Sequence, residues 1–174
     1  MNKQKTTAAS LEEHIEMLSN KDGMARQMAR KALVSIGATA VASLAGVLKN
    51  SRVDQARWEA AKALGDIADK RSIPALVGAL EDGNEDVAWL AAEGLKKFKI
   101  AAWQALLNEL INNGADSNLL RLGVHHVLLD QKEEGYDDLL AALIQALEIN
   151  TAPELRLEAA RVILKKLESG EKRS

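Results

Sequence analysis

The stretch ARWEAAKAL at Ala56–Leu64 decides the fold, because nearly the same residues return further along the chain. They recur as VAWLAAEGL at Val87–Leu95 and as LRLEAARVI at Leu155–Ile163, and a fainter version occupies Ala25–Leu33. Repetition at about thirty residues is typical of a solenoid, in which each unit buries its apolar face only by stacking on its neighbours. The sequence therefore predicts a repeat protein.

Alignment of the repeats places one residue of each in a common slot, with successive spacings of 31, 31, 33 and 35 residues: Arg26, Arg57, Ala88, Arg121 and Arg156. A second apolar pattern at helical spacing precedes each repeated helix, as at Leu76 and Leu80. Each unit is therefore predicted to be a helical hairpin. We expect one domain of five units, approximately 11–37, 39–69, 72–99, 101–131 and 136–168, with mobile tails at 1–10 and 169–174.

Composition supports an all-α fold without disulfides. The chain has 174 residues, of which 47% are hydrophobic, 28% charged and only 3% aromatic, and alanine and leucine dominate. Absence of cysteine excludes thiol nucleophiles and thiolate metal sites. A net charge of -2 gives no global basic field for nucleic acid or an anionic membrane. The polar N-terminus does not resemble a secretory signal, and the apolar run Ile36–Leu48 is too short for a membrane span, so we expect a cytoplasmic protein.

The repeats resemble the HEAT family, particularly its short variant, the phycobilisome-lyase-type HEAT-like repeats. Units of that variant read roughly VRxxAAxALG, followed by a loop and PALxxLL. The match is best at Ala56–Leu80, where ARWEAAKALG, DIADKR and SIPALVGAL follow the pattern. The resemblance implies a right-handed α-solenoid, an α-α superhelix of about five HEAT-like hairpins. It also implies that the second helix of each hairpin lines the concave side.

Helical projection predicts which side of these second helices is exposed. At about 100° per residue, Ala56, Ala60 and Leu64 share one stripe, while Trp58 lies on the opposite side and Trp89 occupies the same slot in the next unit. When the alignment is extended to all repeats, the residues in this slot and beside it form an apolar strip with a rim of mixed charge. The predicted partner-binding residues are Met28, Lys31, Trp58, Glu59, Lys62, Trp89, Leu90, Glu93, Leu122, His126, Leu157 and Arg161.

Such a strip favours a non-enzymatic scaffold or adaptor that binds a protein or peptide segment, best an apolar helix. Neighbouring tryptophans in water are unusual without a partner, and a rim of mixed sign favours a protein over a polyanion. A homodimer contact and a purely structural cluster are the alternatives for Trp58 and Trp89. Trp103 begins a separate stripe with Leu106 and Leu110 and is predicted to lie in the core.

Enzyme activities of HEAT-like proteins leave traces that can be sought in the sequence. Iron-dependent hydroxylases of this architecture carry His-Glu pairs, whereas His14, His125 and His126 precede no glutamate here. HEAT-like DNA glycosylases use a strongly basic surface, which the rim lacks, so nucleic-acid binding is the less favoured alternative. The resemblance also allows a bilin lyase subunit or a bilin chaperone as an alternative. We expect no catalytic residue, metal or cofactor.

Overall fold

The structure is a computed structural model that describes residues 2–113, 116–148 and 152–170. Every regular element in these ranges is an α-helix or a short 3-10 helix, and the α-helices follow one another as pairs. The chain divides into two compact units, Met1–Gly94 and Leu95–Ser174, where the sequence predicted a single domain. Each hairpin of a repeat stack contacts mainly its neighbours, so the repeat pattern gives no sign of this division.

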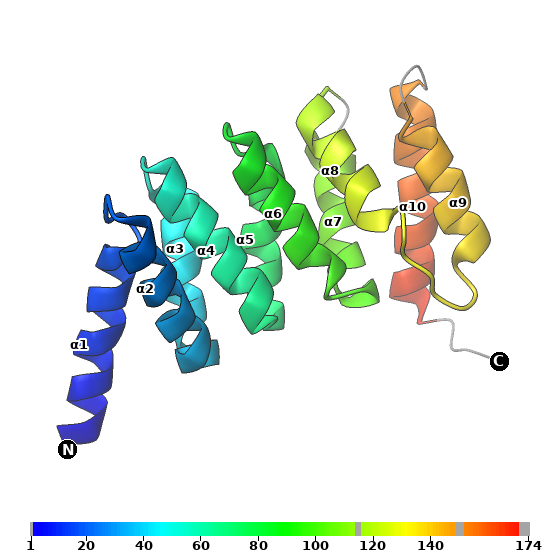
Figure 1. Cartoon of the computed structure of the whole chain (residues 1–174). Coiled ribbons are helices and arrows are strands. Elements are labelled where there is room, and N and C mark those ends of the chain that lie inside the picture. Colours follow the sequence, from blue (N-terminus) through cyan, green and yellow to red (C-terminus); the bar gives the residue numbers. More distant parts are fainter. Residues whose placement is uncertain (1, 114–115, 149–151, 171–174) are drawn as a thin grey trace. The chain divides into compact units, whose positions relative to one another are not determined.

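The first unit contains three helical hairpins. Their second helices, α2, α4 and α6, lie in front in Figure 1, with α3 and α5 behind them. The bounds are α1 Asn2–Met17, α2 Gly23–Ile36, α3 Val41–Asn50, α4 Asp54–Ile67, α5 Ile73–Gly78 and α6 Glu85–Lys96, with 3-10 helices η1 Gly37–Ala40, η2 Lys70–Ser72 and η3 Ala79–Glu81. Helix α1 begins at Asn2, so residues 2–10 are helical where the sequence predicted a tail.

Local signals explain where these helices begin and end. The side chain of Asp22 caps α2 by accepting a hydrogen bond from the backbone N–H of Met24 at 2.9 Å. Pro74 lies in the first turn of α5, where its missing N–H leaves no intrahelical bond unmade. Gly37 ends α2 with a φ of 70°, a conformation that favours glycine. These residues separate the repeated apolar patterns into hairpins.

The stretch Gly23–Asn50 is long and apolar enough, by length and composition, to be a candidate membrane span among the described residues. In the structure Gly37 divides it into α2 and α3, which belong to successive hairpins. Leu33, Leu44 and Leu48 from this stretch are buried among the packed helices. These three leucines belong to the core of the first unit.

Alanines and glycines allow close packing inside the first unit. Ala56, Ala60 and Ala63 are fully buried on the inner side of α4, as the projection predicted. Gly65 on α4 faces Gly94 on α6 so closely that a Cβ built on Gly65 would lie 2.9 Å from the Gly94 Cα. Small residues at these positions bring α4 and α6 together and fix the spacing of the second helices.

The second unit contains the remaining two hairpins. Its helices are α7 Ile100–Asn113, α8 Asn118–Leu128, α9 Asp137–Ala146 and α10 Pro153–Ser169, and α10 packs against both α7 and α9. Trp103 is buried in this unit beside the ring of Tyr136, with centroids 5.7 Å apart in an edge-to-face arrangement. The prediction that Trp103 belongs to the core is confirmed. Of the predicted C-terminal tail, residues 171–174 lie outside the described residues.

Candidate partner-binding site

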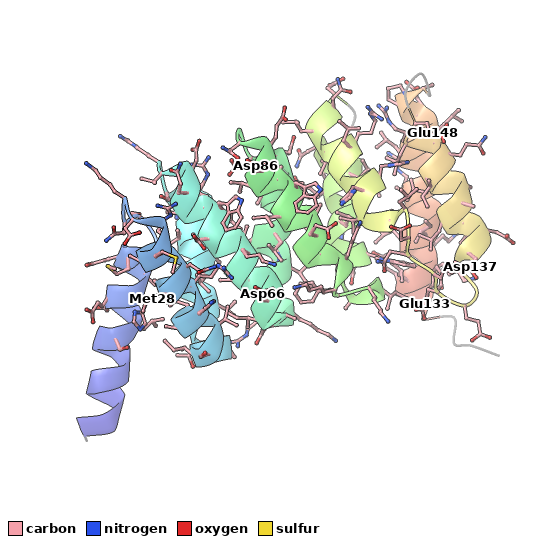
Figure 2. The ribbon with its side chains drawn as sticks, viewed as in Figure 1. Met28, Asp66, Asp86, Glu133, Asp137 and Glu148 are labelled. Atoms are coloured by element: carbon pink, nitrogen blue, oxygen red, sulfur yellow. The ribbon has the colours of Figure 1, made fainter. Side chains whose placement is uncertain are left out.

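Four large apolar residues lie on the second helices of the first unit, and we call them together the tryptophan face: Met24, Met28, Trp58 and Trp89. Met24 and Met28 lie one turn apart on α2 and are 65% and 67% exposed, while Trp89 on α6 is 55% exposed. Figure 2 labels Met28 on its helix. Trp58 on α4, predicted to be exposed, is half-buried. Met24 was missed by the sequence reasoning, although its spacing of four residues from Met28 could have indicated it.

Two predicted contact residues are buried and cannot extend this face. Leu90 is only 8% exposed, and Glu59 is 5% exposed. Each directly follows a tryptophan, and a step of about 100° around the helix turns it from the outer side towards neighbouring helices. The prediction that Leu90 and Glu59 belong to the exposed strip and its rim was therefore wrong.

Glu59 forms a buried charge cluster with two arginines of α2. Nε of Arg30 donates a hydrogen bond to Oε2 of Glu59 at 2.7 Å. Nε of Arg26 lies 3.8 Å from Oε1 of Glu59, outside hydrogen-bond range. Because Arg26 and Arg30 are four residues apart on one helix, both reach the same carboxylate on α4. Glu59 thus joins two hairpins through these ion pairs.

The predicted rim contains charges of both signs within the first unit. Lys31 is exposed, and Lys62 is partly exposed and pairs with Asp66 one turn on, at 3.5 Å. Asp66 also lies 3.6 Å from Arg30, and Figure 2 shows it on α4. Glu93 on α6 is half-buried and has a partner of its own. This surface can therefore accept either sign of charge beside the apolar residues.

A pocket of about 330 Å³ opens beside Trp58. Residues from α2, the start of α4 and the start of α6 line it: Arg26, Asp54, Gln55, Trp58, Glu59, Asn84 and Asp86. Asn84 orders its rim, since its Nδ2 donates to Oδ2 of Asp54 at 3.2 Å and its Oδ1 accepts from the backbone N–H of Asp86 at 3.1 Å. The pocket combines an aromatic side chain with several carboxylates.

Arginines in the repeated slot form hydrogen bonds to the loops of the hairpins. Nε and Nη2 of Arg57 donate to the two carboxylate oxygens of Asp82 at 2.7 and 2.8 Å, and its Nη1 donates to the carbonyl of Ser51 at 2.9 Å. Arg26 and Arg121 likewise donate to the loop carbonyls of Asn20 and Leu147. The arginines in these three repeats therefore stabilise the fold and are not free to bind a partner.

The Arg57–Asp82 pair shifts the pKa of both groups. Burial by itself raises the pKa of Asp82, but hydrogen bonds from the Arg57 side chain and the Asn84 backbone, together with the charge of Arg57, lower it below 3.8 overall. The hydrogen bond to Asp82 raises the pKa of Arg57. Both groups are therefore charged at neutral pH.

In the second unit, the four remaining predicted residues lie on two helices. Leu122 on α8 is 51% exposed, and His126, one turn further, is half-buried. Leu157 on α10 is half-buried, whereas Arg161 is exposed and lies 3.9 Å from Glu158. Within the described ranges, no group of three or more histidine, aspartate or glutamate side chains could hold a metal ion.

Paired helices that stack through apolar and small residues, with a loop-binding arginine in a repeated slot, define this chain as an all-α solenoid of helical hairpins. A family model described as HEAT repeats matches residues 44–122, so this part of the chain is similar to HEAT repeats. The finer resemblance to the phycobilisome-lyase type stays a prediction. No curated protein matches the chain at a significant level.

Proposed function

We infer that this protein is a non-enzymatic scaffold or adaptor that binds a protein or peptide segment on the tryptophan face of its first unit. HEAT repeats are commonly protein-interaction scaffolds. The observation that carries the inference is the exposure of Met24 and Met28 on the second helix of the first hairpin and of Trp89 on the second helix of the third. Monomeric proteins seldom expose such groups together without a binding role.

The chemistry of this face suits a partner segment with an apolar side. Tryptophan buries a large area and is enriched among the residues whose truncation weakens interfaces most. Methionine is flexible and adapts its shape to the side chains packed against it. An amphipathic helix would place its apolar residues on Trp89 and Met28 and its polar residues near Lys31 and Lys62.

Selection from a randomised peptide library displayed on phage, with the full chain as bait, tests this proposal. Selected peptides are then synthesised and their affinities measured by fluorescence anisotropy. We expect Trp89→Ala to weaken binding by about thirtyfold, because an interface anchor contributes at least about 2 kcal/mol. Leu155→Ala is the matched control, since Leu155 is an exposed leucine of α10 outside the predicted site.

Two results would contradict the proposal. Equal affinities for wild type and Trp89→Ala would place peptide binding away from the tryptophan face. A wild-type mass in solution twice that of Trp89→Ala would assign the face to contact between two copies of the chain. Light scattering on both proteins therefore accompanies the affinity measurements.

A further inference from the structure

We propose that the pocket beside Trp58 binds an arginine side chain of the partner segment. This inference rests on the proposed function, because the pocket adjoins the tryptophan face through Trp58 itself. The pocket indicates which residue of the partner segment binds beside Trp58. The apolar surface by itself does not indicate that residue.

An aromatic side chain forms part of the pocket wall. Trp58 is half-buried there, and its large indole ring is the preferred surface for stacking a cation. The pocket of about 330 Å³ has room for a side chain and not for a whole folded element. Gln55 on the same rim adds an amide oxygen that can accept a hydrogen bond. Shape and wall chemistry thus favour a long planar cation.

Carboxylates outnumber cations around this pocket. Asp54 lies 3.0 Å from Nη2 of Arg57, but that guanidinium is already held by both oxygens of Asp82. Glu59 is held by Arg30 at 2.7 Å and lies 3.8 Å from Arg26. Three carboxylates, those of Asp54, Glu59 and Asp86, therefore line the pocket beside a single guanidinium, that of Arg26.

Among the carboxylates that line the pocket, that of Asp86 forms no ion pair with any of the described residues. It lies in the first turn of α6, where Figure 2 labels it, and it lines the pocket. The backbone N–H of Asp86, and not its carboxylate, contacts Asn84 by donating to the Asn84 Oδ1. An incoming cation would thus find an available negative charge beside the indole of Trp58.

The buried carboxylate of Glu59 supplies a second, independent reason for a hydrogen-bond donor in the pocket. Its side chain is 7% exposed and lines the pocket, and Nε of Arg26 lies 3.8 Å from its Oε1, beyond hydrogen-bond range. A guanidinium carries several N–H donors in one plane, so it can stack on an indole while donating to carboxylates at its edge. An ammonium group lacks the plane, and an anion would be repelled by Asp54 and Asp86.

NMR titration of the full chain with N-acetyl-arginine amide tests the inference on the pocket alone. The indole N–H signals of the three tryptophans are assigned with single Trp→Phe variants. We expect a saturable shift of the Trp58 signal, and a much smaller one with N-acetyl-citrulline amide, which has the same shape without the charge. Asp86→Asn should weaken arginine binding by about fivefold, the effect of one partly exposed charge pair.

Glu85→Gln is the matched control, because Glu85 is an exposed carboxylate next to Asp86 that does not line the pocket. Equal shifts with arginine and citrulline probes, or an unchanged affinity in Asp86→Asn, would overturn the inference. If selected peptides depend on Trp89 while the arginine probe does not bind, this inference falls and the proposed function stands. If the probe binds beside Trp58 while no selected peptide depends on Trp89, the proposed function falls and the arginine pocket stands.

Discussion

Trp58 and Glu59 are neighbours in sequence whose side chains meet different surroundings. Trp58 lines an open pocket, whereas Glu59 is buried against Arg26 and Arg30 of the preceding hairpin. A buried carboxylate is tolerated only when its charge is paired, because removing it from water is costly. The arginines that pair with it lie about thirty residues earlier in the chain, so the sequence pattern around Glu59 did not predict its burial.

Glu59→Gln should lower the free energy of unfolding by about 2 kcal/mol, because it removes the hydrogen-bonded counter-charge of Arg30 and leaves only Asp66, at 3.6 Å, to balance that guanidinium. Urea unfolding followed by circular dichroism measures the change. Glu85→Gln, at an exposed position, should change stability by less than about 0.5 kcal/mol. Similar small changes in both variants would mean that the Glu59 cluster contributes little to the fold.

Acid should destabilise the protein partly through Asp82. Its pKa in the folded state is lowered below the ordinary 3.8, since the hydrogen bonds and charge of Arg57 outweigh burial. The stabilisation is therefore complete well above pH 4 and is lost as the pH falls through the folded-state pKa. Asp69 behaves similarly, because a hydrogen bond from the Arg71 side chain lowers its pKa to about 2.

The measurement is the urea midpoint of wild type and Asp82→Asn at neutral pH and at about pH 3. We expect the variant to be less stable at neutral pH and to lose less stability on acidification, because it has no carboxylate at residue 82 to protonate. An identical loss in both proteins would contradict a stabilising Arg57–Asp82 pair.

At the scale of elements, the close approach of α4 and α6 depends on two glycines. A Cβ on Gly65 would lie 2.9 Å from the Gly94 Cα, and one on Gly94 would lie 3.2 Å from the Gly65 Cα and 3.3 Å from a methyl group of Leu76. In both cases the nearest atom belongs to the backbone, which cannot move aside as a flexible side chain can. The two glycines therefore set the spacing between α4, which carries Trp58, and α6, which carries Trp89.

Gly65→Ala should destabilise the protein by about 1–3 kcal/mol, because the added methyl forces the two helices apart. Gly46→Ala is the matched control: a Cβ there meets nothing within 4 Å, and alanine is the better helix former in the interior of α3. We expect the control to be stabilised by about 0.5–1 kcal/mol. Thermal melting distinguishes the two effects, and a stabilised Gly65→Ala would refute the close contact.

Repeat periodicity predicted the helices because each apolar pattern maps onto one packed face. The start of α1 was predicted wrongly: residues 2–10 show no apolar period, yet the helix begins at Asn2. Alanine, lysine and glutamine are good helix formers, so their intrinsic propensity favours a helix in this segment although the apolar period begins only at Leu11. An amphipathic period indicates burial of one helix face, so a helix segment without that period is not predicted by it.

At the scale of the molecule, a repeat protein distributes its stability among neighbouring hairpins. Projection of single helices predicted the exposure of Met28, Trp89 and Leu122 correctly, because these residues point away from the packed side. It could not predict the division into two units or the pocket beside Trp58, which combines side chains from three helices. Both depend on contacts between hairpins and not on the pattern within one.

Trp103→Ala should remove a fully buried side chain from the second unit and cost about 3–5 kcal/mol there. Hydrogen exchange with mass spectrometry should show a greater loss of protection in α7–α10 than in α2–α4, since coupling in a repeat array runs mainly between neighbours. Trp89→Ala should leave protection in both units nearly unchanged, because the side chain is largely exposed. Equal losses throughout the chain in Trp103→Ala would instead indicate one fully cooperative unit.

The most direct test of the central claim, that the tryptophan face binds a partner segment, is fluorine NMR of 5-fluorotryptophan-labelled protein titrated with a selected peptide. The three signals, assigned through Trp→Phe variants, report separately on Trp58, Trp89 and the buried Trp103. We expect the Trp89 and Trp58 signals to shift and saturate with the peptide while the Trp103 signal stays in place. Binding of the peptide with Trp58 and Trp89 unchanged would contradict it.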